Sequence, residues 1–173
     1  VYPPQDALAV IEDESLGNGG GPYNLLKDLS KMEVRIPLTG VGLVGEDSDG
    51  EHILNDCKNS AIDCELVKVT NEAPTSYTDV MSVKSTGRRT FFHQRGANAL
   101  LNESHFDLSK SNAWLLHLAY LNLLDSLDII DDSGYTGATH VLKKARELGM
   151  KTSIDLVSVE SDMFNRVIKP SLP

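Results

Sequence analysis

The sequence predicts one α/β domain built on a mainly parallel sheet, and three observations support this class. Apolar segments typical of buried strands alternate with segments of helical periodicity along most of the chain. The order strand, helix, strand between residues 113 and 157 implies a right-handed parallel crossover. The length of 173 residues is ordinary for a single domain with one core.

The first half of the chain gives two strand–helix units. The glycine-rich segment inside the first unit, between its strand and its helix, suits a tight turn or a close approach of the backbone to a ligand. Pro22 is suited to the first turn of the helix that follows, and Asp47 or Ser48 could cap the second helix. The expected elements are a strand (7–11), a glycine loop (17–21), a helix (22 to 31–33), a strand (37–44), a helix (from 48) and a strand (64–69).

The pattern changes between residues 75 and 94. Residues 77–83 and 89–94 alternate as strands do, and Ser85, Thr86 and Gly87 form a turn between them, which predicts a β-hairpin. The hairpin interrupts the alternation of strands and helices, so we expect it to stand outside the main sheet as a lid or arm.

The second half repeats the strand–helix alternation. Gly149 stops a helix whose apolar face recurs at helical spacing. The expected elements are a strand (113–118), a helix (138–148), a strand (151–157) and a further helix (162–168).

Composition and charge limit the function classes. A net charge of −9 opposes binding to nucleic acid, and no apolar run approaches the roughly 20 residues of a membrane helix. An anionic ligand would need a local basic patch. The best candidate is a basic cluster that could equally be a solvated face: Lys84, Arg88, Arg89 and Arg95.

Cys57 and Cys64 are the only cysteines, and no signal-peptide pattern opens the sequence. We therefore expect a cytoplasmic protein without a disulfide framework. The five histidines do not fall in paired ligand spacing, so we expect no structural zinc and no other metal site.

Several motifs occur in an order that resembles the ribokinase (PfkB) family of carbohydrate kinases. A glycine run and an asparagine (19–24) precede a Gly- and Asp-rich strand end (41–50). Residues 74–76, 86–91 and 96–99 resemble the family's lid hairpin and the return from it. Together these motifs span nearly the whole chain.

The resemblance implies a ribokinase-like, doubly wound fold with helices on both faces of the sheet, and a small β-sheet lid formed by about 5–16 and 75–96. It implies transfer of the ATP γ-phosphate, with Mg²⁺, to a hydroxyl of a small sugar or polyol. The family's first core strand should precede Val1, and its Gly-Ala-Gly-Asp segment with the catalytic base should follow Pro173. We therefore expect a partial kinase domain with no catalytic residue, no bound ATP or Mg²⁺ and no turnover of its own.

The glycine loop supplies the first candidate sugar contacts, which are Gly20, Gly21 and Asn24. Backbone without a Cβ can approach sugar hydroxyls, and an amide both donates and accepts hydrogen bonds, as a hydroxyl does. The alternative is that the glycines form a hinge and that Asn24 caps its helix.

Two strand ends supply further candidates, because ligands of open α/β sheets bind at the carboxyl ends of strands. The resemblance implies a sugar contact at Tyr120, and Asp155 ends the next parallel strand. The alternatives are that Tyr120 is an aromatic residue of the core and that Asp155 caps a helix or a loop. Asp155-Leu156-Val157 departs from the Asp-Pro-Asn of many relatives, so no phosphate or metal role follows for Asp155.

His93 and Arg95 lie where the lid returns to the core, and they could bind a carboxylate or phosphate on the sugar. The alternative is that they are solvated or paired with other side chains.

Three functions are compatible with the sequence: a sugar kinase, a nucleoside kinase of the same fold, and a non-catalytic sugar-binding module. One Trp and four Phe leave few platforms for stacking a purine, which disfavours the nucleoside kinase. We also expect a homodimer through the lid, whose strand edges and apolar residues such as Val80 and Phe92 a small sheet cannot cover.

Overall fold

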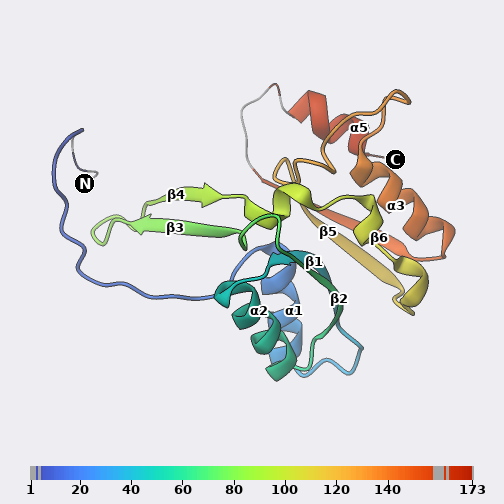
Figure 1. Cartoon of the computed structure of the whole chain (residues 1–173), viewed down its shortest axis with the longest axis horizontal. Helices are drawn as coiled ribbons and strands as arrows, with labels where there is room; N and C mark the ends of the chain where they lie inside the picture. The colour runs from blue at the N-terminus through green and yellow to red at the C-terminus, as the bar shows by residue number, and fades with distance from the viewer. Residues whose placement is uncertain (1–2, 4, 158–161, 163, 173) are drawn as a thin grey trace.

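The computed structural model describes residue 3, residues 5–157, residue 162 and residues 164–172, and every structural statement below refers to these (Figure 1). In chain order the helices and strands are α1 (Gly21–Lys31), β1 (Thr39–Gly45), α2 (Ser48–Asn59), β2 (Asp63–Thr70), β3 (Tyr77–Ser82), β4 (Arg89–Gln94), β5 (Leu115–Leu121), α3 (Gly137–Glu147), β6 (Lys151–Leu156) and α5 (Lys169–Ser171). Short 3₁₀ turns cover Gly96–Leu100, Glu103–His105 and Leu108–Lys110, and a π-helical turn covers Phe164–Ile168.

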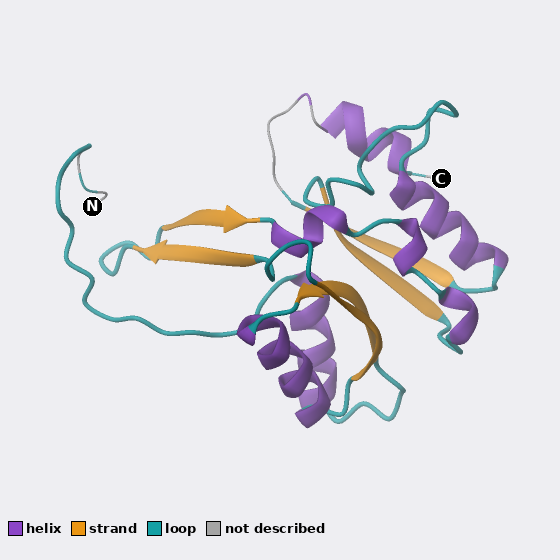
Figure 2. Cartoon of the chain, viewed as in Figure 1, coloured by secondary structure: helices purple, strands orange, loops and turns teal. Residues whose placement is uncertain are grey.

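Two parallel strand pairs, each with a connecting helix, make up the body of the molecule (Figure 2). β1 pairs with β2 around α2, and β5 pairs with β6 around α3, in parallel register. The predicted α/β class and the predicted parallel pairing across the helix between residues 113 and 157 are confirmed, and β1–β2 is a second such unit. Within the described residues, no ladder of hydrogen bonds joins β1–β2 to β5–β6.

One hydrophobic core nevertheless spans both pairs. It includes Leu43 of β1, Leu118 and Leu121 of β5, and the buried face of α3 at residues 138, 141, 142 and 145. Burial of each such leucine contributes roughly 1.5–3 kcal/mol. The helical spacing of the α3 residues in the sequence is therefore the signal that located this helix correctly. Gly149, at φ 84°, follows its end as predicted.

The hairpin of β3 and β4 forms an antiparallel sheet of its own that extends away from the body (Figure 1). Tyr77 pairs with Gln94 at its base and Ser82 with Arg89 near its tip. Its large apolar side chains are exposed on both faces: Tyr77, Val80, Met81, Phe91 and Phe92. The predicted hairpin and its separation from the parallel strands are confirmed.

The strand expected over residues 7–11 is wrong. This segment carries no strand, and the side chains of Leu8, Val10 and Ile11 are exposed. β-propensity reflects packing on a partner strand, and no described strand pairs with this segment. Its described link to the hairpin is an exposed ion pair between Glu12 and Lys84, 2.7 Å from Nζ to Oε2.

The helix expected over 162–168 is only partly described, because residue 163 lies outside the described residues. The part from Phe164 to Ile168 is a π-helical turn, and the short α5 continues it.

Candidate functional site

The turn after β1 is organised around Asp47, which caps α2. Its Oδ1 accepts hydrogen bonds from the Gly50 amide at 2.8 Å and from the Thr75 hydroxyl at 2.6 Å, and its Oδ2 accepts from the Thr75 amide at 2.7 Å. These hydrogen bonds, the one from the Thr75 hydroxyl first, hold the pKa of Asp47 below its ordinary value. The expectation that Asp47 or Ser48 caps this helix is confirmed for Asp47.

The same contacts fix the base of the hairpin. The Thr75 hydroxyl, which donates to Asp47, also accepts from the Gly45 amide at 2.9 Å. On the other stem of the hairpin, the Ala97 amide donates to the Pro74 carbonyl at 2.7 Å. Both stems are therefore held at the carboxyl end of β1, next to any ligand bound there.

The glycine loop meets the end of β5. Gly20, at φ 96°, is the N-cap of α1, and a Cβ on Gly21 would lie 2.7 Å from the ring of Tyr120. Only a glycine lets the tyrosine ring approach this closely. The structure thus brings together Gly20, Gly21 and Tyr120, which the sequence analysis grouped as sugar contacts. Tyr120 is partly buried rather than enclosed in the core.

Asn24 lies in the first turn of α1 with an exposed side chain. The alternative that Asn24 caps this helix is wrong, because Gly20 holds the cap position and no side chain caps it. Among the described residues the Asn24 side chain has no hydrogen-bond partner, so it is available to a ligand.

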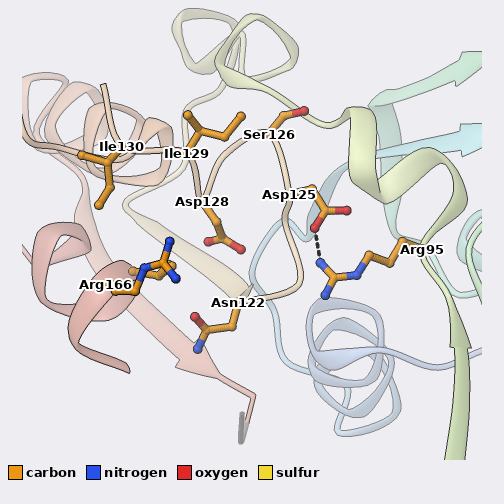
Figure 3. A pocket seen from close by; sticks show the side chains of 9 residues that line it. Arg95, Asn122, Asp125, Ser126, Asp128, Ile129, Ile130 and Arg166 are labelled. Carbon is orange, nitrogen blue, oxygen red and sulfur yellow. Dashed lines mark hydrogen bonds and ion pairs between the residues drawn. The ribbon is translucent and has the colours of Figure 1, made fainter. Parts of the chain in front are cut away.

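A cleft of about 640 Å³ opens at the carboxyl end of β5 (Figure 3). Its lining comes from the hairpin stem, the loop after β5 and the π-helical turn: Arg95, Asn122, Asp125, Ser126, Asp128, Ile129, Ile130, Arg166 and Val167.

The loop after β5 is tied to the hairpin stem on one side of this cleft. Arg95 forms an ion pair with Asp125 through Nη1 and Oδ1, and the Ser126 hydroxyl donates to the Ala99 carbonyl at 2.7 Å. A movement of the hairpin stem would therefore move the wall of the cleft.

Two oxygens on this wall are buried without a partner among the described residues: Asn122 Oδ1 and Asp128 Oδ1. Asn122 is 4% exposed and has φ 75°, a conformation that asparagine tolerates better than most residues. The other carboxylate oxygen of Asp128 accepts from the Leu124 amide at 2.9 Å. Burial raises the pKa of Asp128 above its ordinary value, and the hydrogen bond from Leu124 opposes this only in part.

Asp155 lies on β6 beside Ala119 and Tyr120, between the register pairs Leu118–Ile154 and Leu121–Leu156. Its Oδ1 accepts from the next amide, that of Leu156, at 2.8 Å. It is exposed at the same strand ends as Tyr120.

His93 and Arg95 are both engaged by other protein groups. His93 Nδ1 lies 2.8 Å from the hydroxyl of Thr78, its partner across the hairpin, and it is exposed there. Arg95 pairs with Asp125. These contacts favour the alternative that His93 and Arg95 are solvated or paired with other side chains, and they disfavour a role of the two residues in binding an anion.

Asn122, Asp128 and Arg166 were not predicted as site residues from the sequence. One signal could have found the first two: both lie in the loop that follows the apolar segment that predicted β5, at the carboxyl end of a parallel strand. Their burial and the approach of Arg166 depend on the tertiary fold, which periodicity does not reveal.

Among the described residues, no group of three His, Cys, Asp or Glu side chains is placed to hold a metal ion. In that same part of the chain no helix has the length and apolar character needed to cross a membrane. Cys57 and Cys64 are free thiols, and burial raises the pKa of Cys64 to about 12.

Comparison with known proteins places this geometry in a family. Residues 4–170 match the model of the "pfkB family carbohydrate kinase". A ribokinase from Dictyostelium discoideum is 29% identical over 120 residues, which are 69% of this chain and 35% of that protein.

Solved structures share the fold. A fructokinase from Xylella fastidiosa with bound ATP has a TM-score of 0.67 and 22% identity, over 88% of this chain and 48% of that one. An E. coli structure in complex with ATP and Mg²⁺ has a TM-score of 0.62 and 14% identity, over 94% of this chain and 51% of that one. The chain thus spans about a third of the ribokinase and about half of each structure.

Proposed function

Because the chain belongs to the PfkB family of carbohydrate kinases, we propose that the complete protein carrying it transfers the γ-phosphate of ATP to a hydroxyl of a small sugar or polyol. The chain described here supplies the sugar-binding side of that reaction.

The observation that carries this proposal is the meeting of three elements at the carboxyl ends of the strands. The glycine loop contacts Tyr120 there, the base of the hairpin is fixed there through Thr75, and the polar cleft opens there. Ligands of open α/β sheets bind at this edge. A hairpin anchored beside the edge is positioned to close over a bound sugar and exclude water, which protects the transferred phosphoryl group from hydrolysis.

Five residues are our candidate sugar contacts in this arrangement. The backbone at Gly20 and Gly21 can approach sugar hydroxyls, and the amide of Asn24 can donate to and accept from them. Tyr120 offers a phenol and an apolar ring face at the same place. Asp155, beside Tyr120 in the ladder, offers carboxylate oxygens.

ATP and Mg²⁺ are bound in family structures. Among the described residues no three His, Cys, Asp or Glu side chains gather. Our proposal assigns no nucleotide contact, no metal contact and no catalytic residue to this chain. Phosphoryl transfer depends on positioning and charge neutralisation, so the chain alone should show no turnover.

We keep a nucleoside kinase and a non-catalytic sugar-binding module as alternatives. The experiment is to assay the complete protein and the 173-residue chain with ATP and Mg²⁺ against neutral sugars, polyols and nucleosides. Turnover by the complete protein on sugars alone supports the proposal. Preferred turnover of nucleosides supports the nucleoside kinase instead. Sugar binding without any turnover supports the non-catalytic sugar-binding module. Turnover by the chain alone that disappears in Asn24→Ala refutes the assignment of catalysis to the rest of the protein.

A homodimer through the hairpin remains part of the proposal. The hairpin exposes Val80 and Phe92 on opposite faces, and each of its two strands has a free edge. A second copy of the hairpin could cover these surfaces. Sedimentation that finds a monomer at high micromolar concentration, with an ordered hairpin, refutes the dimer.

A further inference from the structure

Asn122 and Asp128 each present one buried oxygen without a hydrogen-bond donor, and both line the cleft at the end of β5. Figure 3 shows their side chains extending from the loop toward the space that the Arg166 guanidinium enters from the other side. A buried acceptor without a donor loses its hydration and gains nothing in return.

Two neighbouring polar groups of the cleft do not relieve this cost, because they are already engaged, and among the described residues no hydrogen bond joins Arg166 to either oxygen. Arg95 pairs with Asp125, and the Ser126 hydroxyl donates to Ala99. One oxygen of Asp128 is held by the Leu124 amide, the nearby backbone amide of Asn122 also lowers the pKa of this carboxyl, and the second oxygen is buried without a hydrogen-bond partner among the described residues. The arrangement is therefore rigid on the protein side and incomplete on the cleft side.

We infer that Asn122 and Asp128 recognise hydroxyl groups of the sugar or polyol substrate, and so help to determine which substrate is accepted. This inference rests on the proposed function and names a specificity element of the same site.

The charges of the cleft favour hydroxyls over other ligands. Two acceptors require donors, which a carboxylate or phosphate group does not have, and Asp128 would repel such an anion. A cationic ligand has donors, but it would lie close to the guanidinium of Arg166. A hydroxyl donates to one partner and accepts from another, so neighbouring hydroxyls can satisfy Asn122, Asp128 and Arg166 together.

The position of the pair agrees with the sugar contacts proposed above. Asn122 follows Tyr120 by two residues at the end of β5, and Tyr120 contacts the glycine loop. Tyr120 itself does not line the cleft, so Asn122 and Asp128 lie next to the sugar contacts proposed above along the chain and extend that site.

Two substitutions test the pair without disturbing the fold. Asp128→Asn keeps a carbonyl oxygen for the Leu124 amide but turns the atom that has no partner from an acceptor into a donor. Asn122→Gly removes the amide at a position whose φ of 75° glycine adopts without strain. Ile129→Val, at the exposed rim of the same cleft, is the matched control.

The measurement is the dissociation constant of the complete protein for D-ribose, D-fructose and D-sorbitol by isothermal titration calorimetry, with thermal unfolding of each variant in parallel. We expect both variants to bind the preferred compound at least about tenfold more weakly, with unfolding temperatures no lower than wild type and unchanged binding in Ile129→Val. Replacing that compound by its deoxy analogue, which lacks the recognised hydroxyl, should weaken binding to the wild type more than it weakens binding to the variants.

The outcomes separate this inference from the proposed function. Wild-type affinity in both variants overturns the inference and leaves the kinase proposal standing. Binding that the variants weaken, without phosphorylation by the wild type, supports the inference and refutes the kinase. A wild type that neither binds nor phosphorylates any of the three compounds counts against both. Equal loss in Ile129→Val shows a general disturbance of the cleft and overturns the specific pairing.

Discussion

Two loops that follow parallel strands carry an aspartate at the same edge of the molecule, yet they treat it in opposite ways. After β1, Asp47 accepts three hydrogen bonds, and its pKa is lowered. After β5, Asp128 accepts from Leu124 with one oxygen, the other oxygen is buried alone, and its pKa is raised.

The difference indicates which carboxylate serves the fold and which one is available to a ligand. Every contact of Asp47 links protein to protein: the start of α2, the end of β1 through Thr75, and the hairpin stem. Asp128 accepts from the Leu124 amide with one oxygen, has no hydrogen-bond partner among the described residues for the other, and lines a cleft. A carboxylate beside a glycine-rich strand end is therefore not by itself a sign of a binding site.

The largest expected effect comes from the glycines that let the first loop close. A Cβ at Gly50 would lie 2.3 Å from the Gly45 carbonyl oxygen, a backbone atom that cannot turn aside. We expect Gly50→Ala to lower the free energy of unfolding by about 3 kcal/mol, measured by urea denaturation.

Gly42→Ala is the matched control on β1, because a Cβ there would meet no atom within 4 Å. It should change the free energy of unfolding by less than about 0.5 kcal/mol. If Gly50→Ala were as mild as this control, the loop after β1 would be adaptable, and its contrast with the loop after β5 would be lost.

A smaller effect is expected from Asp47→Asn, which weakens the cap and the hydrogen bonds from Thr75. We expect a loss of about 1–2 kcal/mol at pH 7. Because the pKa of Asp47 is lowered by folding, its ionised form stabilises the protein above the ordinary Asp pKa of about 3.9. That contribution is lost as pH falls through the lowered pKa. The difference between wild type and variant should therefore shrink in thermal unfolding below about pH 4.

Asp49→Asn, in the first turn of the same helix, controls for charge at the helix start. It should cost only a few tenths of a kcal/mol, because it removes a favourable interaction with the helix dipole and no hydrogen bond of the Asp47 kind. If the difference in unfolding temperature between the wild type and Asp47→Asn stayed constant from pH 7 to pH 3, ionised Asp47 would not have the proposed stabilising role.

The sequence predicted the first loop much better than the second, for a physical reason. Capping is local: an Asp just before a helical segment finds its amide three residues away, so the pattern around Asp47 and Gly50 was sufficient. The parallel pairs and the hairpin were also predictable, since alternation and turn chemistry act over short distances. The contact of Gly21 with Tyr120 was anticipated only as a grouping of site residues, through the family resemblance.

Burial and partnership over long distances were not predictable. Residues 7–11 have the composition of a strand but find no partner in the described structure, so composition alone misled. Asn122 and Asp128 are isolated polar residues in a mostly leucine- and isoleucine-containing segment, which by itself predicts no site. Their significance depends on Arg166 approaching from a segment more than 30 residues later in the chain and on the hairpin stem closing the other side.

The smallest expected effect has the opposite sign to that of Asp47→Asn. Folding raises the pKa of Asp128, so the protonated form is favoured in the folded state, and this stability is lost as pH rises through the raised pKa. Above the raised pKa the folded protein therefore holds a carboxylate at a cost. Asp128→Asn removes that charge while keeping the Leu124 contact, so we expect a gain of less than about 1 kcal/mol at pH 7.

Thermal unfolding between pH 3 and pH 8 measures this gain, which should fade below the ordinary Asp pKa of about 3.9, where wild-type Asp128 is protonated in both states. A bound sugar should reverse the order at pH 7, because its hydroxyls donate to Asp128 in the wild type alone and a ligand stabilises the form that binds it more tightly. If Asp128→Asn unfolded at a lower temperature than the wild type at pH 7 without sugar, the Asp128 carboxylate would stabilise the fold as Asp47 does. The contrast between the two loops would then be refuted.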